Sequence, residues 1–313
     1  MRLKPSAAII IALVGLMAAQ QSLKQIDGLR NTVEDWTRAG LWNNFLTVYA
    51  NETSREARSL SVRAGASSSN AQSENEFHWR GRVAPGRAVE IKGVNGDVRA
   101  ESSSSGEVEV IATKQGRRSD PAEVRVQVVE HADGVTVCAL YPGPAGSEPN
   151  ECAPGSGGRM NTRNNDVKVD FMVRVPAGVR FIGRTVNGEV ETAALGSDVE
   201  AYTVNGGIRI SAAGYAQAKT VNGSIVASLG NPNWTKPLEF KTVNGSITLE
   251  IPAGTNAELE AETLNGDISM DFPVTVQGRI SRKRVSGTIG SGGRELKLKT
   301  VNGSIRLPRV AGV

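Results

Sequence analysis

The 313-residue sequence contains few aromatic residues, histidines and cysteines. Aromatic side chains make up 4% of the chain, and there are two histidines and two cysteines. So few rings exclude a stacking platform for nucleic-acid bases. Lysine and arginine are interspersed with acidic residues to a net charge of +4, so no basic stripe is formed. We therefore expect no nucleic-acid partner.

The common enzyme and metal motifs are also missing. His78 and His131 lie far apart, and neither belongs to a zinc-ligand motif. The sequence has no P-loop, no G-x-S-x-G and no H-E-x-x-H. We expect no cofactor, no metal and no catalytic residues.

Two groups of acidic residues require a separate test. Asp97, Glu189 and Asp267 each follow an Asn-Gly pair, but the equivalent positions elsewhere hold Gly, Ser or Thr, so no carboxylate ladder for calcium is predicted. A pair of carboxylates, as polysaccharide-cleaving β-helices use, could come from four other glutamates. Alternation places these glutamates on the outer face, and nothing singles out a pair: Glu250, Glu258, Glu260 and Glu262.

What the sequence does contain is a repeat of about 20 residues with the consensus Thr-Val-Asn-Gly-Ser-Ile. Its turn residues are Asn187, Asn205, Asn222, Asn244, Asn265 and Asn302, with an upstream precursor at Asn95. Residues 284–289 are a degenerate copy. On both sides of each turn, apolar and polar residues alternate as in β-strands. Asn-Gly suits a turn because both residues tolerate positive φ.

Two all-β folds fit this repeat. In an antiparallel meander, each Asn-Gly pair forms the tip of a hairpin. In a β-solenoid of the parallel β-helix type, each repeat is one coil and equivalent side chains stack. Stacking explains why the flanking Thr, Val and Ser-Ile recur, because like side chains then form ladders, including hydrogen-bonded Asn ladders. We expect the solenoid and keep the meander as the alternative.

The chain divides into five segments. Residues 1–21 have a basic start and a short apolar run, which indicates a signal peptide or a membrane anchor. Residues 22–50 read as an amphipathic helix, with apolar residues three and four apart, and 51–76 as a flexible linker. We expect an irregular all-β region over 77–178 that caps the solenoid, followed by the tandem repeats over 179–313. Pro308 is expected to block strand addition at the C-terminal end.

The two cysteines, Cys138 and Cys152, flank a loop rich in Pro and Gly. An even pair in an exported protein indicates a disulfide. Closing a loop of this size contributes about 3 kcal/mol in the chain-entropy model.

With its repeats, the chain resembles the bacterial "putative adhesin" family of β-strand-repeat proteins, the DUF4097 type. The resemblance is carried by the Thr-Val-Asn-Gly-Ser-Ile units from Thr185 to Ile305 and by residues 89–98 and 173–178. It implies an exported, non-enzymatic β-repeat protein with adhesion or envelope-stress roles. The separation of about 55 residues between the apolar run and the β body departs from the family pattern.

We therefore expect an envelope-associated protein that offers a surface for protein or glycan contacts. A solenoid presents a long, flat face rather than a pocket. The alternatives are a glycan-active β-helix enzyme and a self-assembling envelope scaffold. The expected location is exported: periplasmic, on the cell surface, or anchored in the cytoplasmic membrane through the N-terminal segment.

Overall fold

The computed structural model describes residues 75–162, 164–231, 234, 236–276 and 281–310. The predicted signal or anchor (1–21), the amphipathic helix (22–50) and nearly all of the linker lie outside these residues. Strand β1 begins at Glu76, so the last residue expected in the linker belongs to a sheet. Within the described part of the chain, no helix has the length and apolar character needed to cross a membrane.

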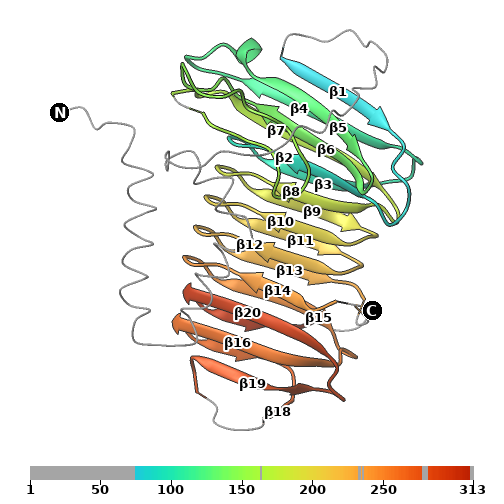
Figure 1. Ribbon diagram of the computed structural model, residues 1–313. Helices are drawn as coiled ribbons and strands as arrows, with labels where there is room; N and C mark the ends of the chain where they lie inside the picture. The colour runs from blue at the N-terminus through green and yellow to red at the C-terminus, as the bar shows by residue number, and fades with distance from the viewer. Residues whose placement is uncertain (1–74, 163, 232–233, 235, 277–280, 311–313) are drawn as a thin grey trace, which may run out of the picture.

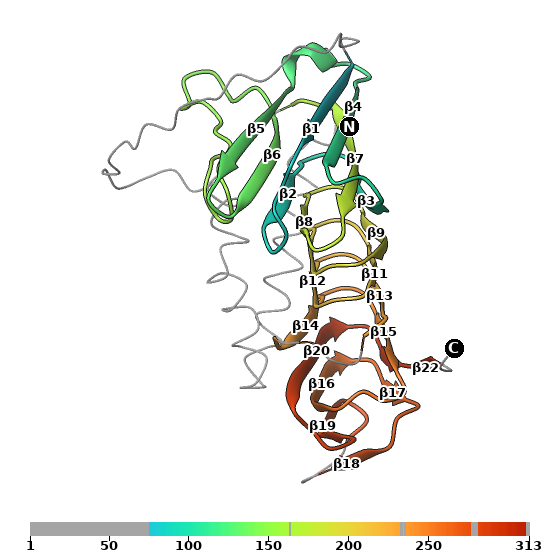
Figure 2. The same cartoon turned by 90° about the vertical axis from the view of Figure 1, so that its right-hand side faces the viewer.

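The described chain forms two β-sheets that face each other along one stack (Figures 1 and 2). Sheet A runs in the order β1 (Glu76–Gly81), β4 (Val108–Gln115), β7 (Lys168–Pro176), β3 (Val98–Ser103), β9 (Val190–Leu195), β11 (Ile208–Ala212), β13 (Ile225–Leu229), β15 (Ile247–Pro252), β21 (Ile305–Leu307), β17 (Ile268–Met270), with β22 (Arg309–Val310) beside β15. Sheet B runs in the order β18 (Val274–Val276), β19 (Arg284–Ile289), β16 (Ala257–Asn265), β20 (Arg294–Asn302), β14 (Leu238–Lys241), β12 (Ala216–Lys219), β10 (Val199–Tyr202), β8 (Arg180–Arg184), β2 (Ala88–Lys92), β6 (Gly134–Leu140), β5 (Arg125–His131).

Each repeat contributes one strand to each sheet, and its Asn-Gly corner joins the two. Strand β14 pairs in parallel with β12 and β20, and β15 pairs in parallel with β13 and β21. The protein is therefore a β-solenoid, as predicted. The antiparallel meander is wrong, because it requires the two strands that flank one Asn-Gly pair to be hydrogen-bonded to each other.

The core lies between the sheets and consists of the residues that alternate inward. In the coil formed by β14 and β15, Leu238, Phe240, Ile247, Leu249 and Ile251 are fully buried, as the alternation predicts. Equivalent residues stack from coil to coil and form one continuous apolar core. Few of these residues are aromatic, and the core is filled mainly by Val, Ile, Leu and Ala.

Three hydrogen-bonded ladders run along the corner and explain the consensus. Each Asn after the first donates its side-chain amide to the side-chain oxygen of the preceding Asn at 2.8 Å, in the order 95, 187, 205, 222, 244, 302, 265. Each Thr hydroxyl donates to a glycine carbonyl of the neighbouring coil at 2.7 to 2.9 Å. In the third, interrupted ladder, the Asp or Ser that follows glycine accepts a backbone amide of the neighbouring coil, as Asp97 does from Glu189 and Ser224 does from Ser246. None of these hydrogen bonds would form at a hairpin tip, because each of them joins two neighbouring coils.

The glycine of each corner has a different role from the one expected. None of the motif asparagines has positive φ, and of the motif glycines only Gly96 and Gly303 lie in that region. A Cβ added to Gly206 would instead lie 1.9 Å from the carbonyl oxygen of Gly188 in the neighbouring coil. The corner requires glycine mainly because the stacked backbones leave no room for a side chain.

The order of coils in the stack differs from their order in the chain. Strands β20 and β21, from the last repeat, lie between β14 and β16 and between β15 and β17, respectively. Pro308 therefore follows an interior strand, and the expectation that it blocks the end of the solenoid is wrong. The degenerate repeat is not a coil either, because β19 is a continuous strand that pairs antiparallel with β16. Figure 2 shows β19 and β18 continuing sheet B around the lower end of the stack.

The N-terminal end of the stack consists of one regular coil and, beyond it, strands that pair antiparallel. Residues 88–103 already form a coil, since β2 and β3 pair in parallel with β8 and β9 and Asn95 starts the Asn ladder. The repeats thus begin before residue 179. Beyond this coil, β4 pairs antiparallel with β1 and β7, and β5 pairs antiparallel with β6.

Candidate functional site

The outer face of sheet B carries two adjacent rows of polar side chains, which we call the lysine row and the glutamate row. Both follow from alternation, because outward positions two residues apart on each strand stack in register on the next strand. The lysine row consists of Lys92, Arg184, Tyr202, Lys219, Lys241 and Lys299. The glutamate row consists of Glu90, Ile182, Glu200, Gln217, Glu239, Lys297 and Glu260.

Glu239 is the centre of the ion pairs between these rows. Its carboxylate lies 2.6 Å from Lys219 Nζ and 2.5 Å from Lys241 Nζ, and it accepts a hydrogen bond from Gln217 Nε2 at 3.1 Å. Burial alone would raise the pKa of Glu239, but the two lysines outweigh it and lower the pKa to about 2. The carboxylate is therefore held ionised, unlike that of a general acid at neutral pH.

Two tyrosines join the rows in the middle of the face. The Tyr202 hydroxyl donates to Glu200 at 2.9 Å, and the Arg184 guanidinium lies 4.1 Å from the centre of its ring. Tyr215 donates to Gln217 at 3.0 Å. Burial raises the pKa of both phenols, so both hydroxyls stay protonated. Rings of this kind, with an apolar body and a polar tip, are common in contact surfaces.

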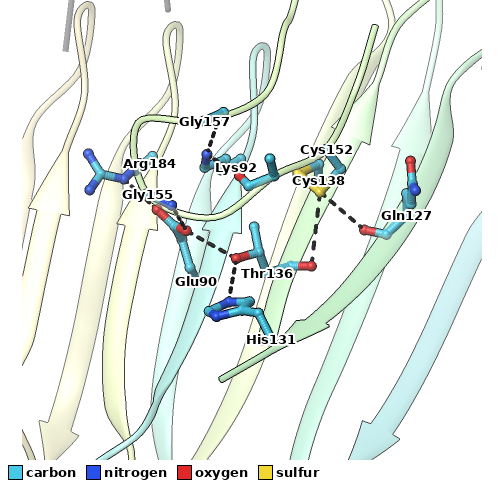
Figure 3. Close-up of a disulfide and its surroundings, with 11 residues drawn as sticks. Glu90, Lys92, Gln127, His131, Thr136, Cys138, Cys152, Gly155, Gly157 and Arg184 are labelled. Carbon is cyan, nitrogen blue, oxygen red and sulfur yellow. Dashed lines mark hydrogen bonds and ion pairs between the residues drawn. A yellow bond between two sulfur atoms is a disulfide. The ribbon is translucent and has the colours of Figure 1, made fainter. Parts of the chain in front are cut away.

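A loop tied down by the disulfide covers the upper end of this face (Figure 3). Cys138 and Cys152 are joined, with their Cα atoms 5.7 Å apart. The buried Glu90 accepts hydrogen bonds from Gly155 N at 2.8 Å, Arg184 Nε at 2.8 Å and the Thr136 hydroxyl at 3.1 Å. Each bond fixes the loop or a neighbouring strand to the face.

Lys92 also holds this loop in place, because its ammonium group donates hydrogen bonds to two backbone carbonyls of the loop. Its Nζ lies 2.5 Å from Ala153 O and 3.0 Å from Gly157 O. Burial lowers the pKa of Lys92, partly offset by the charge of Glu90. The disulfide and these bonds together make the loop a fixed part of the sheet-B side.

Beside the lysine row, the valines of the motif form an apolar ridge at the corner. We call it the valine ridge: Val204, Val221, Val243, Val301 and Leu264. It is separate from the inter-sheet core, although Val243 exposes only 3% and Val301 only 4% of its surface.

The outer face of sheet A has a different character. Its side chains are exposed and form pairs of opposite charge between neighbouring coils, such as Arg209 with Glu189 at 2.7 Å and Arg99 with Glu191 at 3.4 Å. The apolar Val226 on this face exposes 43% of its surface. Exposed pairs of this kind contribute little energy, and the face has the pattern of an ordinary solvated surface.

The residues considered as catalytic or metal-binding from sequence are scattered. His78 pairs with Glu76 on β1, whereas His131 Nε2 lies 3.1 Å from the Thr136 hydroxyl on sheet B. Glu189 pairs with Arg209, and Asp97 lies 3.4 Å from Lys168. Over the described residues, no group of three or more His, Cys, Asp or Glu side chains could hold a metal ion.

Three of the four glutamates considered as a source of paired carboxylates lie on β16 and make other contacts. Glu258 accepts from Thr288 at 3.1 Å, and Glu260 pairs with Lys299 at 3.0 Å. Glu262 points outward as predicted but exposes only 4% of its surface, so it is not a solvated residue. Alternation gives the direction of this side chain but not what shelters it.

A hollow of about 250 Å³ lies near the N-terminal end, between the β1–β2 loop and the turn that joins β5 to β6. Trp79, Val83 and Val135 form its apolar part, with arginines and His131 in its wall. Glu130 is the one carboxylate in its lining. The hollow lacks the pair of acids that glycoside hydrolysis requires.

Sequence reasoning did not single out the lysine row, the tyrosines or the valine ridge. The signal was present, because Lys219, Lys241 and Lys299 occupy the same position, directly before the Thr of three repeats. Only the stacking order makes them neighbours.

Comparison with known proteins supports this architecture. The sequence matches the family described as Toastrack DUF4097 over residues 45–308. The chain belongs to the Toastrack DUF4097 family. The resemblance inferred from the repeats is thereby confirmed, and the ladders described above are the features that give this Toastrack chain its regular coils.

Solved structures similar to this Toastrack chain are distant. A "putative cell adhesion protein" from Clostridium sporogenes is 11% identical, with a TM-score of 0.44, and the match covers 75% of this chain and 100% of that one. A "putative adhesin" from Bacteroides fragilis is 12% identical, with a TM-score of 0.31 and coverage of 76% and 98%. One from Parabacteroides merdae is 11% identical, with a TM-score of 0.23 and coverage of 76% and 97%. A search of the curated proteins found no match.

Proposed function

We propose that this protein is an exported, envelope-associated and non-enzymatic β-solenoid whose sheet-B side is a contact surface for an envelope protein or glycan. The observation that carries the proposal is the difference between the two outer faces. Sheet B gathers tyrosines, a row of lysines and an apolar ridge along the stack, whereas sheet A presents exposed pairs of opposite charge. Aromatic and apolar groups next to fixed charges are typical of recognition surfaces.

The accessible margin of this surface is where an outside partner would bind. Tyr215 is half-buried and Lys236 is exposed, with its Nζ 5.4 Å from the Tyr215 ring. Gln217 and Glu239 lie beside them and offer hydrogen-bond acceptors. A ring face next to amide and carboxylate groups suits sugar rings and extended peptides alike.

Location outside the cytoplasm is supported by two features. The basic start and apolar run of residues 1–21 have the pattern of an export signal or anchor. A disulfide between buried cysteines fits an oxidising compartment. N-terminal sequencing of the mature protein together with membrane fractionation tests this part, and an intact start in the cytosolic fraction would contradict it.

The two alternative functions have less support. A glycan-active enzyme needs two convergent carboxylates, but of the four glutamates considered for that role Glu258 is hydrogen-bonded to Thr288 and Glu260 is ion-paired with Lys299. A self-assembling scaffold needs open ends, but antiparallel strands extend both sheets at the N-terminal end of the stack and sheet B at the other end, and the N-terminal edge strands β1 and β5 carry the exposed His78, Arg80 and Arg125.

The test is binding without turnover. The full-length protein is immobilised and exposed to a panel of envelope polysaccharides and detergent-solubilised envelope proteins, and both retention and new reducing ends are measured. We expect retention that Tyr215→Ala weakens, no effect of Arg209→Ala on sheet A, and no new reducing ends. Turnover, or equal retention by both variants, would overturn the proposal.

A further inference from the structure

Parallel stacking gives the Asn-Gly corners a direction. In six of the seven corners, the backbone amide of the glycine donates to the backbone carbonyl of the Asn in the next coil, at 2.9 to 3.0 Å. The glycines that do so are Gly96, Gly188, Gly206, Gly223, Gly245 and Gly303. The seventh, Gly266, belongs to the last coil, which is formed by β16 and β17 at the lower end of the stack (Figure 2). No further coil lies beyond it to accept its amide.

Residues 282 and 283 take the place of a further coil only in part. In an interior coil, the amides of the Thr, the Gly and the Ile of the corner all donate to the next coil. In the last coil, Thr263 N donates to Lys283 O at 2.9 Å and Ile268 N donates to Arg282 O at 3.1 Å. The amide between these two, Gly266 N, donates to no atom of the residues that the structure describes.

A free glycine amide after an asparagine is a nucleophile, and asparagine is one of the thermolabile residues for this reason. The glycine nitrogen attacks the side-chain carbonyl carbon of the asparagine and forms a new C–N bond. The Cγ–Nδ2 bond breaks, and Nδ2 leaves as ammonia with the proton of the backbone amide. Water then opens the cyclic imide at either of its carbonyls and leaves aspartate or isoaspartate. The reaction therefore requires an unengaged glycine nitrogen and a side chain that can leave its hydrogen bonds.

Fewer hydrogen bonds oppose this reaction at Asn265 than at an interior corner. At Asn222 the side-chain amide and the side-chain oxygen are both bonded within the Asn ladder, and Gly223 N donates to the next coil. Asn265 keeps one of these three bonds to described residues, the donation to Asn302 Oδ1 at 2.8 Å. Two bonds fewer to break correspond to a rate about 30-fold higher.

The other end of the Asn ladder provides a corner of the same sequence. Residues 95–97 and 265–267 are both Asn-Gly-Asp, and Asn95, like Asn265, has a single bond in the Asn ladder. Gly96 N, however, donates to Asn187 O at 2.9 Å. The two ends of the ladder therefore differ in whether the glycine nitrogen is engaged.

Exposure does not single out Asn265. Its side chain is exposed, but so are those of Asn187, Asn205, Asn244 and Asn302. Water therefore reaches most of the corners, and the unengaged nitrogen of the last one is the feature that sets it apart.

We propose that Asn265-Gly266 is a site of spontaneous modification, at which the folded protein converts asparagine to aspartate or isoaspartate while its six other Asn-Gly corners stay intact. The proposal goes beyond the proposed function and does not depend on the contact surface of sheet B. A carboxylate at position 265 cannot donate to Asn302, and it adds negative charge two residues from Asp267. Isoaspartate also lengthens the main chain at the corner. The last coil then loses its bond in the Asn ladder, which loosens β17.

The test is peptide mapping of the full-length protein. Folded and urea-unfolded samples are incubated at mildly alkaline pH and digested, and conversion at all seven corners is followed by mass spectrometry. Digestion in heavy-oxygen water marks any conversion that takes place during the digestion itself. In urea, Asn95 and Asn265 should react at equal rates, because the local sequence alone then decides.

In the folded protein, rates are divided by those in urea. Asn265 should then react about 30-fold faster than Asn222 and about fivefold faster than Asn95. Equal protection of Asn95 and Asn265 would overturn the proposal. So would earlier conversion at an interior corner, or an intact Asn265 in folded protein after all corners have reacted in urea.

Two variants assign the product to this corner. Asn265→Gln should remove the early acidic form that isoelectric focusing detects, because the longer side chain closes the imide far more slowly, whereas Asn95→Gln should keep it. An acidic form that persists in Asn265→Gln would overturn the proposal. Hydrogen exchange in the converted protein should be faster in β17 and unchanged in β13, and unchanged exchange in β17 would overturn the loosening of the last coil.

Discussion

Two adjacent glycines in one corner provide a matched test of why the motif requires glycine. A Cβ added at Gly206 would lie 1.9 Å from Gly188 O, whereas a Cβ at Gly207 would lie 3.5 Å from Ser224 O and 3.8 Å from Glu189 Oε1. Neither glycine has a positive φ. Gly206→Ala and Gly207→Ala therefore differ in the space between coils and not in backbone strain.

The expected cost of Gly206→Ala follows from the bonds that must open. Real Cβ atoms essentially never approach within 3.0 Å of such an atom, so the two coils must separate by at least about 1 Å at the corner. That movement breaks three hydrogen bonds: Thr203 to Gly188 O, Gly188 N to Asn205 O, and the Asn205–Asn187 rung. At about 1 kcal/mol each, the free energy of unfolding falls by about 3 kcal/mol.

The matched substitution, Gly207→Ala, should raise the free energy of unfolding rather than lower it. Alanine at position 207 makes only ordinary contacts and restricts the unfolded chain, which stabilises a protein by about 0.5 kcal/mol. For a domain of this size, about 3 kcal/mol corresponds to a fall in Tm of about 6–12 °C. Urea unfolding of both full-length variants measures the difference. Equal midpoints for Gly206→Ala and Gly207→Ala would refute the reasoning that stacking distance, rather than backbone conformation, selects glycine.

Three further predictions concern the ladder, the lysine row and the last coil. Asn222→Ala removes two hydrogen bonds of the Asn ladder and should cost about 2 kcal/mol in urea unfolding, against about 1 kcal/mol for the terminal Asn265→Ala, which removes one; a larger loss at the terminal position would contradict the ladder. The pKa of Glu239 in the folded protein, about 2, lies below the ordinary glutamate value of 4.5, so its contribution to stability is present above about pH 4.5 and is lost as the pH falls toward 2. The stability difference between the protein and Glu239→Gln should therefore shrink by about 3 kcal/mol between about pH 6 and pH 2, and a constant difference would argue against the ion pairs. Leu298→Ala, at a fully buried position of β20, should cost about 3 kcal/mol, and Met270→Ala, at a half-buried position of the end strand β17, about 1 kcal/mol. Hydrogen exchange should find β20 protected like β14, and early exchange in β20 would contradict its interior position in the sheet.

Much of the fold could be predicted because the motif encodes interactions between coils. Thr, Asn and Ser recur at positions where each makes a hydrogen bond to the neighbouring coil, and these bonds would not form in a hairpin. The inward face was predictable for a simpler reason, since strand side chains alternate with a period of two. The sequence suggested that Asn-Gly is selected because both residues tolerate positive φ. In the structure the corner selects glycine mainly because the stacked backbones leave no space for a Cβ atom.

The contact surface could not be predicted in the same way. Alternation places Lys241 and Glu262 outside, and the structure agrees, yet both are as buried as core residues. Burial of an outward residue depends on what lies over it, which the local pattern does not contain. The rows of lysines and valines become visible only when the coils are set in their stacking order.

That order itself is hidden from the sequence because all coils have the same ladder chemistry. The rung of Asn244 would be satisfied equally well by Asn265, the next repeat in the chain, or by Asn302, which is its actual partner. What distinguishes the two is the antiparallel pair β18–β19, which extends sheet B beyond β16 and leaves only the other side of β16 for the last coil. The degenerate repeat at residues 284–289 supplies β19, so the loss of its Asn-Gly corner is what allows it to cap the stack. The last coil of the chain therefore lies inside the stack, between the coil of β14 and β15 and that of β16 and β17, rather than at its end.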